Sequence, residues 1–288
     1  MKNMKTVAGM LCLAGILSLG MGTTVFAEDG DSHYPVTITT YNYENEPIEM
    51  TFEKAPEKVF AYANSNIEEL LALGLGDKIV AACGLDGDVR EDLKDEFDKI
   101  QYMDTKPSKE EVVAMEPDFI AAWYSSFDDD WLSDVSFWQE RDVNTYMSLN
   151  SAAKGPASEF PRTIEDEYED ILNLGKIFDC EDKAEEIVDQ MKGEIDKVKE
   201  HVEGTDPLSV AVLEDEGDSF RVYGTETLGG NIPETLGAEL KLGAENSENV
   251  GAEDLIAADP DVLFMINYDG FMTADEAIAD ITDNPAYA

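Results

Sequence analysis

The sequence predicts an α/β protein with two similar lobes, joined by one long helix and preceded by a β-hairpin. Three observations support this fold class. Short apolar strands alternate with helices, a pattern typical of parallel β–α units. Residues 109–120 match residues 252–263 without a gap. A helix expected over 181–203 lies between the two copies, with one apolar stripe along it.

The first 27 residues are expected to be a secretory signal peptide. Lys2 and Lys5 give a positive start, residues 7–19 are almost wholly apolar or small, and Val25-Phe26-Ala27 suits a cleavage site. The mature chain is therefore expected outside the cytoplasmic membrane, in the periplasm or at the cell surface. Cys12 is not preceded by a lipobox, so a lipid anchor at this residue is the less favoured alternative.

Composition excludes several classes of function. The chain of 288 residues has a formal net charge of −44, which repels nucleic acid. Cys83 and Cys180 remain after cleavage and are expected to be separate core thiols, with a single disulfide as the alternative. The two histidines, His33 and His201, cannot form a His-rich cleft site, so no metal site is predicted. No catalytic nucleophile arrangement is visible, and no catalytic residue is predicted.

The expected elements fall into three segments after the signal peptide: a first lobe with its hairpin over 34–160, a helical connection over 161–203, and a second lobe over 204–288. The hairpin is expected at 36–41 and 48–52. First-lobe strands are expected at 58–62, 78–82, 118–123 and 143–147, with helices at 66–74, 108–115 and 130–141. The connection has helices at 163–178 and 181–203, and the second lobe has strands at 208–213, 220–223 and 261–266 and helices at 232–240, 252–258 and 274–280.

The internal match is the strongest signal of two lobes. Each copy reads as a helix with two acidic residues near its start, ended by proline, after which aspartate opens a strand. Helix–Pro-Asp–strand is also a common local arrangement, which is the alternative to true duplication. The length of the gapless match favours duplication.

Four segments resemble one known family. They are Lys54–Val59, Glu68–Val80, Ser108–Trp123 and Gly251–Ile266. In order and spacing the chain resembles the substrate-binding proteins of ABC importers for iron-siderophores, haem and vitamin B12. The resemblance implies two Rossmann-like lobes with a ligand cleft between them. It also implies a monomeric binding protein, without enzyme activity or cofactor, that delivers a chelate to a membrane permease.

The resemblance also implies a docking role for two glutamates. Glu110 and Glu253 occupy equivalent positions in the repeat, each near the start of the helix before its Pro-Asp strand. Matching glutamates of the family dock on arginines of the permease. The alternative for either residue alone is stabilisation of the helix dipole, which is also the expected role of Glu111 and Asp254.

A ligand cleft of this fold lies outside the carboxyl ends of the strands. Aromatic side chains there can stack on a flat ligand, and arginines would suit an anionic iron catecholate. Ordinary core packing is the alternative for Tyr62 and Trp123, and a surface charge without a role is the alternative for Arg90. The candidate ligand-binding residues are Tyr62, Asn64, Ser65, Arg90, Trp123, Tyr124, Arg221, Tyr223, Asn267 and Tyr268.

Two further expectations concern function and completeness. An iron-siderophore is the first choice of ligand, with haem and cobalamin behind it; an extracytoplasmic enzyme or a surface-adhesion protein on the same lobes is the alternative class. The repeat also predicts a truncated second lobe, because only 22 residues follow Ile266, whereas the first lobe continues into a helix and a further strand.

Overall fold

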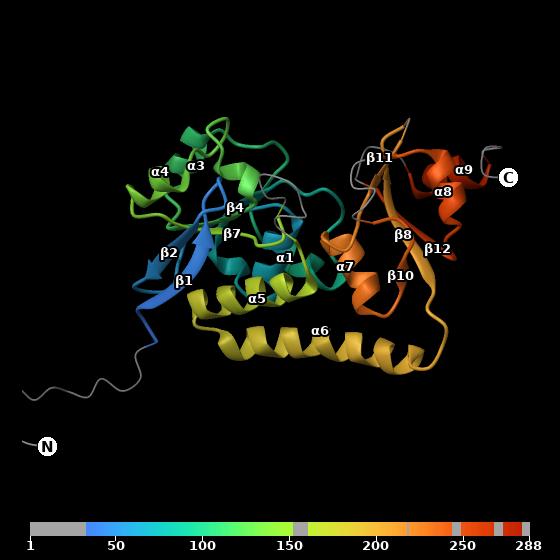
Figure 1. Ribbon diagram of the computed structural model, residues 1–288. Coiled ribbons are helices and arrows are strands. Elements are labelled where there is room, and N and C mark those ends of the chain that lie inside the picture. The colour runs from blue at the N-terminus through green and yellow to red at the C-terminus, as the bar shows by residue number, and fades with distance from the viewer. Residues whose placement is uncertain (1–32, 152–160, 218, 244–248, 268–272, 284–288) are drawn as a thin grey trace, which may run out of the picture. The chain divides into compact units, whose positions relative to one another are not determined.

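The computed structural model describes residues 33–151, 161–217, 219–243, 249–267 and 273–283 (Figure 1). Its strands are β1 Val36–Tyr41, β2 Pro47–Phe52, β3 Val59–Tyr62, β4 Ile79–Cys83, β5 Tyr102–Met103, β6 Phe119–Ala122, β7 Asn144–Met147, β8 Ser209–Asp215, β9 Phe220–Val222, β10 Glu239–Leu240, β11 Asn249–Val250 and β12 Val262–Ile266. Its α-helices are α1 Asn64–Ala72, α2 Lys94–Phe97, α3 Lys109–Ala114, α4 Val135–Gln139, α5 Ile164–Phe178, α6 Glu181–Val202, α7 Leu228–Thr235, α8 Ala252–Ala258 and α9 Ala274–Thr282.

The N-terminal hairpin forms as the sequence predicts, and the strands predicted for the first lobe join one sheet, with β5 as an unpredicted edge strand. β1 and β2 pair antiparallel from Val36 opposite Phe52 to Tyr41 opposite Pro47. The first sheet has the order β5-β4-β3-β6-β7, and all its neighbouring strands are parallel. β6 is buried along its whole length, as expected for a central strand covered on both faces.

The long helix α6 packs on the core of the first lobe from Ala184 to Ile195. Ala184 and Val188 are buried there, and Ile187 and Met191 pack against the same core. Towards the other end, Val198 is substantially exposed. The apolar stripe predicted over this helix therefore covers the first core only over its N-terminal part.

The second sheet differs from the first. β8 pairs in parallel with β10 and β12, whereas β9 and β11 are antiparallel additions. The smaller core beneath it is formed by Ala211, Leu213, Phe220, Val222, Leu242, Val250 and Leu255. The α/β fold class with two sheets and a leading hairpin is confirmed, and the second sheet is mixed; the exact lobe boundaries and the cleft stay predictions.

Several elements have bounds that differ from the predicted ones. The helix expected at 130–141 is reduced to α4, because Asp134 rather than an earlier residue caps it and accepts a hydrogen bond from the Ser136 amide. The helix expected at 232–240 begins earlier, at Leu228, and the chain then enters the short strand β10. Asp179 ends α5 in the left-handed conformation, and Cys180 rather than Asp179 directly precedes α6.

The two Pro-Asp segments make the same contact in the two sheets. The Asp118 carboxylate accepts hydrogen bonds from the Glu57 and Lys58 amides, just before β3. The Asp261 carboxylate accepts from the amide and hydroxyl of Ser209, where β8 begins. Each aspartate thus ties the start of its own strand to the start of the neighbouring strand, which supports duplication over chance similarity.

Candidate ligand-binding site

The carboxyl end of the first sheet brings several predicted residues together. β3 ends at Tyr62, β4 ends at Cys83, and Trp123 directly follows β6. The Trp123 indole N–H donates to the Ser65 hydroxyl oxygen over 3.1 Å, which joins the end of β6 to the first turn of α1. The side chains of Tyr62 and Trp123 are both half-buried, so each is partly packed against the protein and partly accessible.

Two residues that sequence reasoning missed complete this aromatic group. Trp131 lies edge-on to Tyr62, with ring centroids 4.7 Å apart, and the Lys106 Nζ lies 3.6 Å from the Trp131 centroid. Burial raises the pKa of Tyr62 and lowers the pKa of Lys106. A cation over an aromatic face is a favourable arrangement, and it places a positive charge at this edge of a strongly acidic protein.

Asn64 and Tyr124 have structural partners. The Asn64 side-chain oxygen accepts a hydrogen bond from the Asp86 amide over 2.6 Å and so fixes the loop after β4. Tyr124 stacks on Tyr43 of the hairpin loop at a centroid separation of 5.7 Å. Both residues lie at the predicted edge, but they shape it rather than project freely from it.

Arg90 is engaged in an ion pair. Its guanidinium donates two hydrogen bonds to the Asp92 carboxylate, of 3.1 and 2.7 Å. This contact favours the alternative of a surface charge for Arg90. The side chain nevertheless lines a cavity of about 580 Å³ together with Ser65, Glu68, Glu69, Glu167 and residues of α6.

Two acids that line that cavity, Glu69 and Glu167, are neighbours of the buried Asp170. The Asp170 carboxylate accepts hydrogen bonds from the Tyr146 hydroxyl over 2.7 Å and from the Leu149 amide. Burial raises the pKa of Asp170 to about 8, opposed by these hydrogen bonds and assisted by the nearby Glu167. Burial also raises the pKa of Glu69 and of Glu167.

The second sheet contributes a smaller predicted group. The Tyr223 hydroxyl donates to the Glu214 carboxylate over 2.7 Å, and the Arg221 guanidinium lies 5.5 Å from the Tyr223 ring centroid. Asn267 is exposed just after β12. Tyr268 lies outside the described residues.

Arg162 was not among the predicted residues. Its Nε donates to the Ser151 carbonyl, and it lines a cavity of about 260 Å³ at the end of β7 with Tyr41, Asn45 and Ser148. Its amide donates to the Glu226 carbonyl, which ties the start of the helical connection to the segment before α7. The sequence signal was weak, because Arg162 follows a stretch with no strand or helix pattern.

The two predicted docking glutamates are equivalent in structure as well as in sequence. Glu110 and Glu253 are exposed in the first turns of α3 and α8, and the structure shows neither carboxylate in a hydrogen bond or ion pair with another described residue. Their neighbours behave differently, because Glu111 accepts from the Ser108 amide and Asp254 from the Gly251 amide. The two neighbours therefore close the helix starts by hydrogen bonds, a more specific contact than the expected stabilisation of the helix dipole.

The cysteines and the described helices give two further findings. Cys83 and Cys180 are unpaired, so the disulfide alternative is not realised. Among the described helices, none combines the length and the apolar character needed to cross a membrane.

With this geometry in place, comparison with known proteins identifies the class. The profile of the periplasmic binding protein family matches residues 59–288, and the chain belongs to that family. A periplasmic binding protein of Veillonella parvula DSM 2008 is 33% identical, with a TM-score of 0.79 over 88% of this chain and 79% of that one.

Two other relatives are more distant. The uncharacterised ABC transporter substrate-binding lipoprotein YvrC of Bacillus subtilis strain 168 is 27% identical over 69% of this chain and 59% of its own length. The chain thus spans about three-fifths of that curated relative. A protein of an ABC-type Fe3+-hydroxamate transport system of Saccharomonospora viridis DSM 43017 has the same fold, with 23% identity and a TM-score of 0.69 over 88% of this chain and 86% of that one.

Proposed function

We propose that this protein captures an iron-siderophore or related chelate outside the cytoplasmic membrane and delivers it to the permease of an ABC importer. Family membership supports a binding role; two relatives are proteins of ABC transport systems, and one of these systems is for Fe3+-hydroxamate. The enzyme and adhesion alternatives have no such support. Haem and cobalamin remain the second choices of ligand.

The observation that carries the proposal is the aromatic group at the carboxyl end of the first sheet. Tyr62 and Trp123 offer flat apolar surface, whereas the buried Trp131 supports Tyr62 edge-on and holds the positive charge of Lys106 against its face. A chelate with aromatic or conjugated arms and anionic oxygen atoms fits this chemistry. Arg221, on the second sheet, could supply a further cation, because its 3.7 Å approach to Glu214 is a loose contact.

The test is a binding screen of the purified protein by quenching of tryptophan fluorescence. Ferric catecholates, ferric hydroxamates, haem and cobalamins are titrated separately, with the iron-free siderophores as controls. Saturable quenching by a ferric siderophore at one equivalent is expected. Absence of binding by every chelate would refute the proposed ligand class.

Docking is tested on the matched glutamate pair. The double substitution Glu110→Ala and Glu253→Ala should leave chelate affinity unchanged and slow uptake by cells that carry the cognate permease about tenfold or more, since each charge pair at an interface contributes on the order of 1–3 kcal/mol. A control with Glu185→Ala and Glu200→Ala removes the same charge from exposed positions of α6. Equal uptake by both double variants would refute the docking role.

A further inference from the structure

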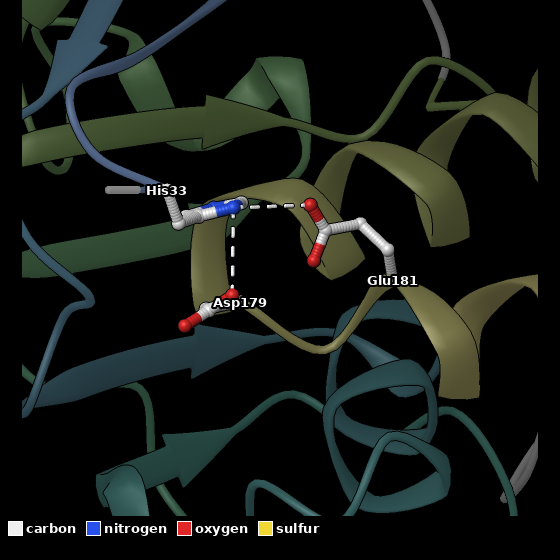
Figure 2. Close-up of side chains that lie close together, drawn as sticks. All are labelled: His33, Asp179 and Glu181. Carbon is white, nitrogen blue, oxygen red and sulfur yellow. Dashed lines mark ion pairs between the residues drawn. The ribbon is translucent and has the colours of Figure 1, made fainter. Parts of the chain in front are cut away.

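A histidine and two carboxylates meet where α5 is followed by α6. Asp179 directly follows α5, and Glu181 is the first residue of α6. His33 lies just before the hairpin, and its Nδ1 is 3.4 Å from the Asp179 Oδ1 and 3.2 Å from the Glu181 Oε1 (Figure 2). None of these residues belongs to the candidate ligand-binding site.

The other ring nitrogen fixes the chemistry of this contact. The His33 Nε2 lies 2.7 Å from the Lys176 carbonyl oxygen. Because a carbonyl can only accept, Nε2 carries a hydrogen and donates it. In a neutral imidazole the lone pair then belongs to Nδ1. This lone pair faces two carboxylate oxygens, so three electron-rich atoms meet and need a positive charge among them.

A second proton on the ring and a metal ion are the two cations that would fill this need. In a charged N–H···O⁻ hydrogen bond the nitrogen and oxygen are about 2.7–2.9 Å apart, and one N–H group points towards one acceptor. The His33 Nδ1 lies farther than this from both carboxylate oxygens, and its distances to the two are nearly equal. In a tetrahedral site with metal–ligand bonds of about 2.0–2.2 Å, neighbouring ligand atoms are roughly 3.3–3.5 Å apart. The 3.4 Å separation from Asp179 falls within this spacing, and the 3.2 Å separation from Glu181 lies just below it.

The surroundings also match those of a metal-bound histidine. Such a histidine donates its second ring N–H to a carbonyl or carboxylate, which orients the ring, and the Lys176 carbonyl accepts that bond here. Tyr34 further restrains the ring edge-on at 4.5 Å and donates its hydroxyl to the Ile177 carbonyl. The side chains of His33, Asp179 and Glu181 are 20%, 59% and 38% exposed, which leaves access for an ion and a water ligand.

We propose that His33, Asp179 and Glu181 form a site for one divalent transition-metal ion of the zinc type. The ligand atoms lie within 4.8 Å of one another and come from the segment before β1 and from the α5–α6 junction. The bound ion would fasten these two segments together. Sequence reasoning predicted no metal site, because it required several histidines in one cleft.

The test titrates the untagged protein with Zn²⁺ by calorimetry and with Co²⁺ by visible absorption. Excess magnesium chloride is present, so that the many surface carboxylates do not contribute. One equivalent of Zn²⁺ and a Co²⁺ spectrum of a four-coordinate site are expected. His33→Asn should weaken binding about tenfold or more, the range seen even for outer partners of metal ligands. His201→Asn removes the other histidine of the chain and should bind as the parent does.

A second substitution keeps the test decisive if His33→Asn unfolds the hairpin region. Glu181→Gln retains the size of the side chain and removes one ligand charge, and it should also weaken Zn²⁺ binding while circular dichroism stays unchanged. Absence of stoichiometric binding, or equal binding by parent, His33→Asn and Glu181→Gln, would overturn the proposal and leave an imidazolium ion pair. The chelate screen does not bear on this outcome.

Discussion

Gly84 shows how one residue shapes the edge of the first sheet. It follows β4 with φ of +84°, a conformation that glycine adopts without strain. A Cβ atom at this position would lie 2.2 Å from the Tyr62 Cε2. The Tyr62 ring therefore occupies the space that any other residue at position 84 would need for its side chain.

We expect Gly84→Ala to destabilise the protein by about 1–3 kcal/mol, through left-handed backbone strain and displacement of Tyr62. Chelate affinity should fall as well, since Tyr62 belongs to the aromatic group. Gly87→Ala in the same loop is the matched control, because a Cβ there meets nothing within 4 Å. Urea denaturation measures the stability change. Equal stability of the two variants would contradict the role given to Gly84.

For individual residues, the sequence predicted where a side chain lies in the fold better than it predicted which side chains it contacts. Tyr62 and Trp123 were placed at strand ends because an apolar strand pattern stops there. Lys106 and Trp131 were missed because they lie in loops that carry no periodic pattern, and Trp131 was assigned to a helix that begins only at Val135. Their proximity to Tyr62 depends on packing between segments far apart in the chain.

A buried acid links α5 to the first sheet. Asp170 has no exposed surface and contacts Tyr146 of β7. The pKa of Asp170 is about 8 in the folded state and about 3.9 in the unfolded state. Between about pH 3.9 and pH 8 the carboxyl group is therefore protonated in the folded state and ionised in the unfolded state. The contribution of Asp170 to the free energy of unfolding is therefore fully present below pH 4 and is lost as the pH rises towards 8.

We expect Asp170→Asn to flatten the fall in stability between pH 5 and pH 8, a fall of up to ~1.4 kcal/mol per pH unit from one such group. Urea denaturation across this range compares the variant with the parent. Asp182→Asn, which removes an exposed charge on α6, should retain the parent slope. Parallel slopes for Asp170→Asn and the parent would show that Asp170 is ionised in the folded state throughout.

The repeated Pro-Asp strands provide an internal comparison of the two sheets. β6 is buried between β3 and β7, whereas β12 pairs with β8 and exposes 54% of Phe264. Amide hydrogen exchange should therefore be clearly slower in β6 than in β12, because exposed and weakly packed strands open more readily. Equal protection of the two strands would contradict this expectation.

Elements with a strong local signal were predictable, and the others were not. The hairpin, α5 and α6 have clear periodicity, and the structure shows a capping box of Ser108 with Glu111 at the start of α3. β5, β10 and β11 have two residues each, too few to show alternation. The start of α7 was missed because Gly229 and Gly230 are poor helix formers; a Cβ on Gly230 would lie 2.1 Å from the Gly224 oxygen, so packing requires glycine there.

The charge of the whole molecule sets its response to salt. With 64 acidic and 20 basic residues, the folded chain holds many like charges close together. The ion pairs of the described residues, such as Lys183 with Glu186 and Lys78 with Glu57, are solvent-exposed or nearly so and contribute little each. Repulsion among unpaired carboxylates therefore dominates the long-range electrostatics and opposes folding.

We expect sodium chloride to stabilise the protein at pH 7.5. Raising the ionic strength from about 0.15 M to 1 M shortens the screening length from about 8 Å to about 3 Å, so repulsion beyond neighbouring side chains is largely removed. A gain of about 1–2 kcal/mol would raise the melting temperature by several degrees, at about 2–4 °C per kcal/mol for a chain of this size. Near pH 4.1, where the net charge is close to zero, the same salt change should have little effect. A melting temperature that falls with salt at pH 7.5 would instead show that attractive ion pairs outweigh the repulsion, and the surface carboxylates would then need partners that the described residues do not show.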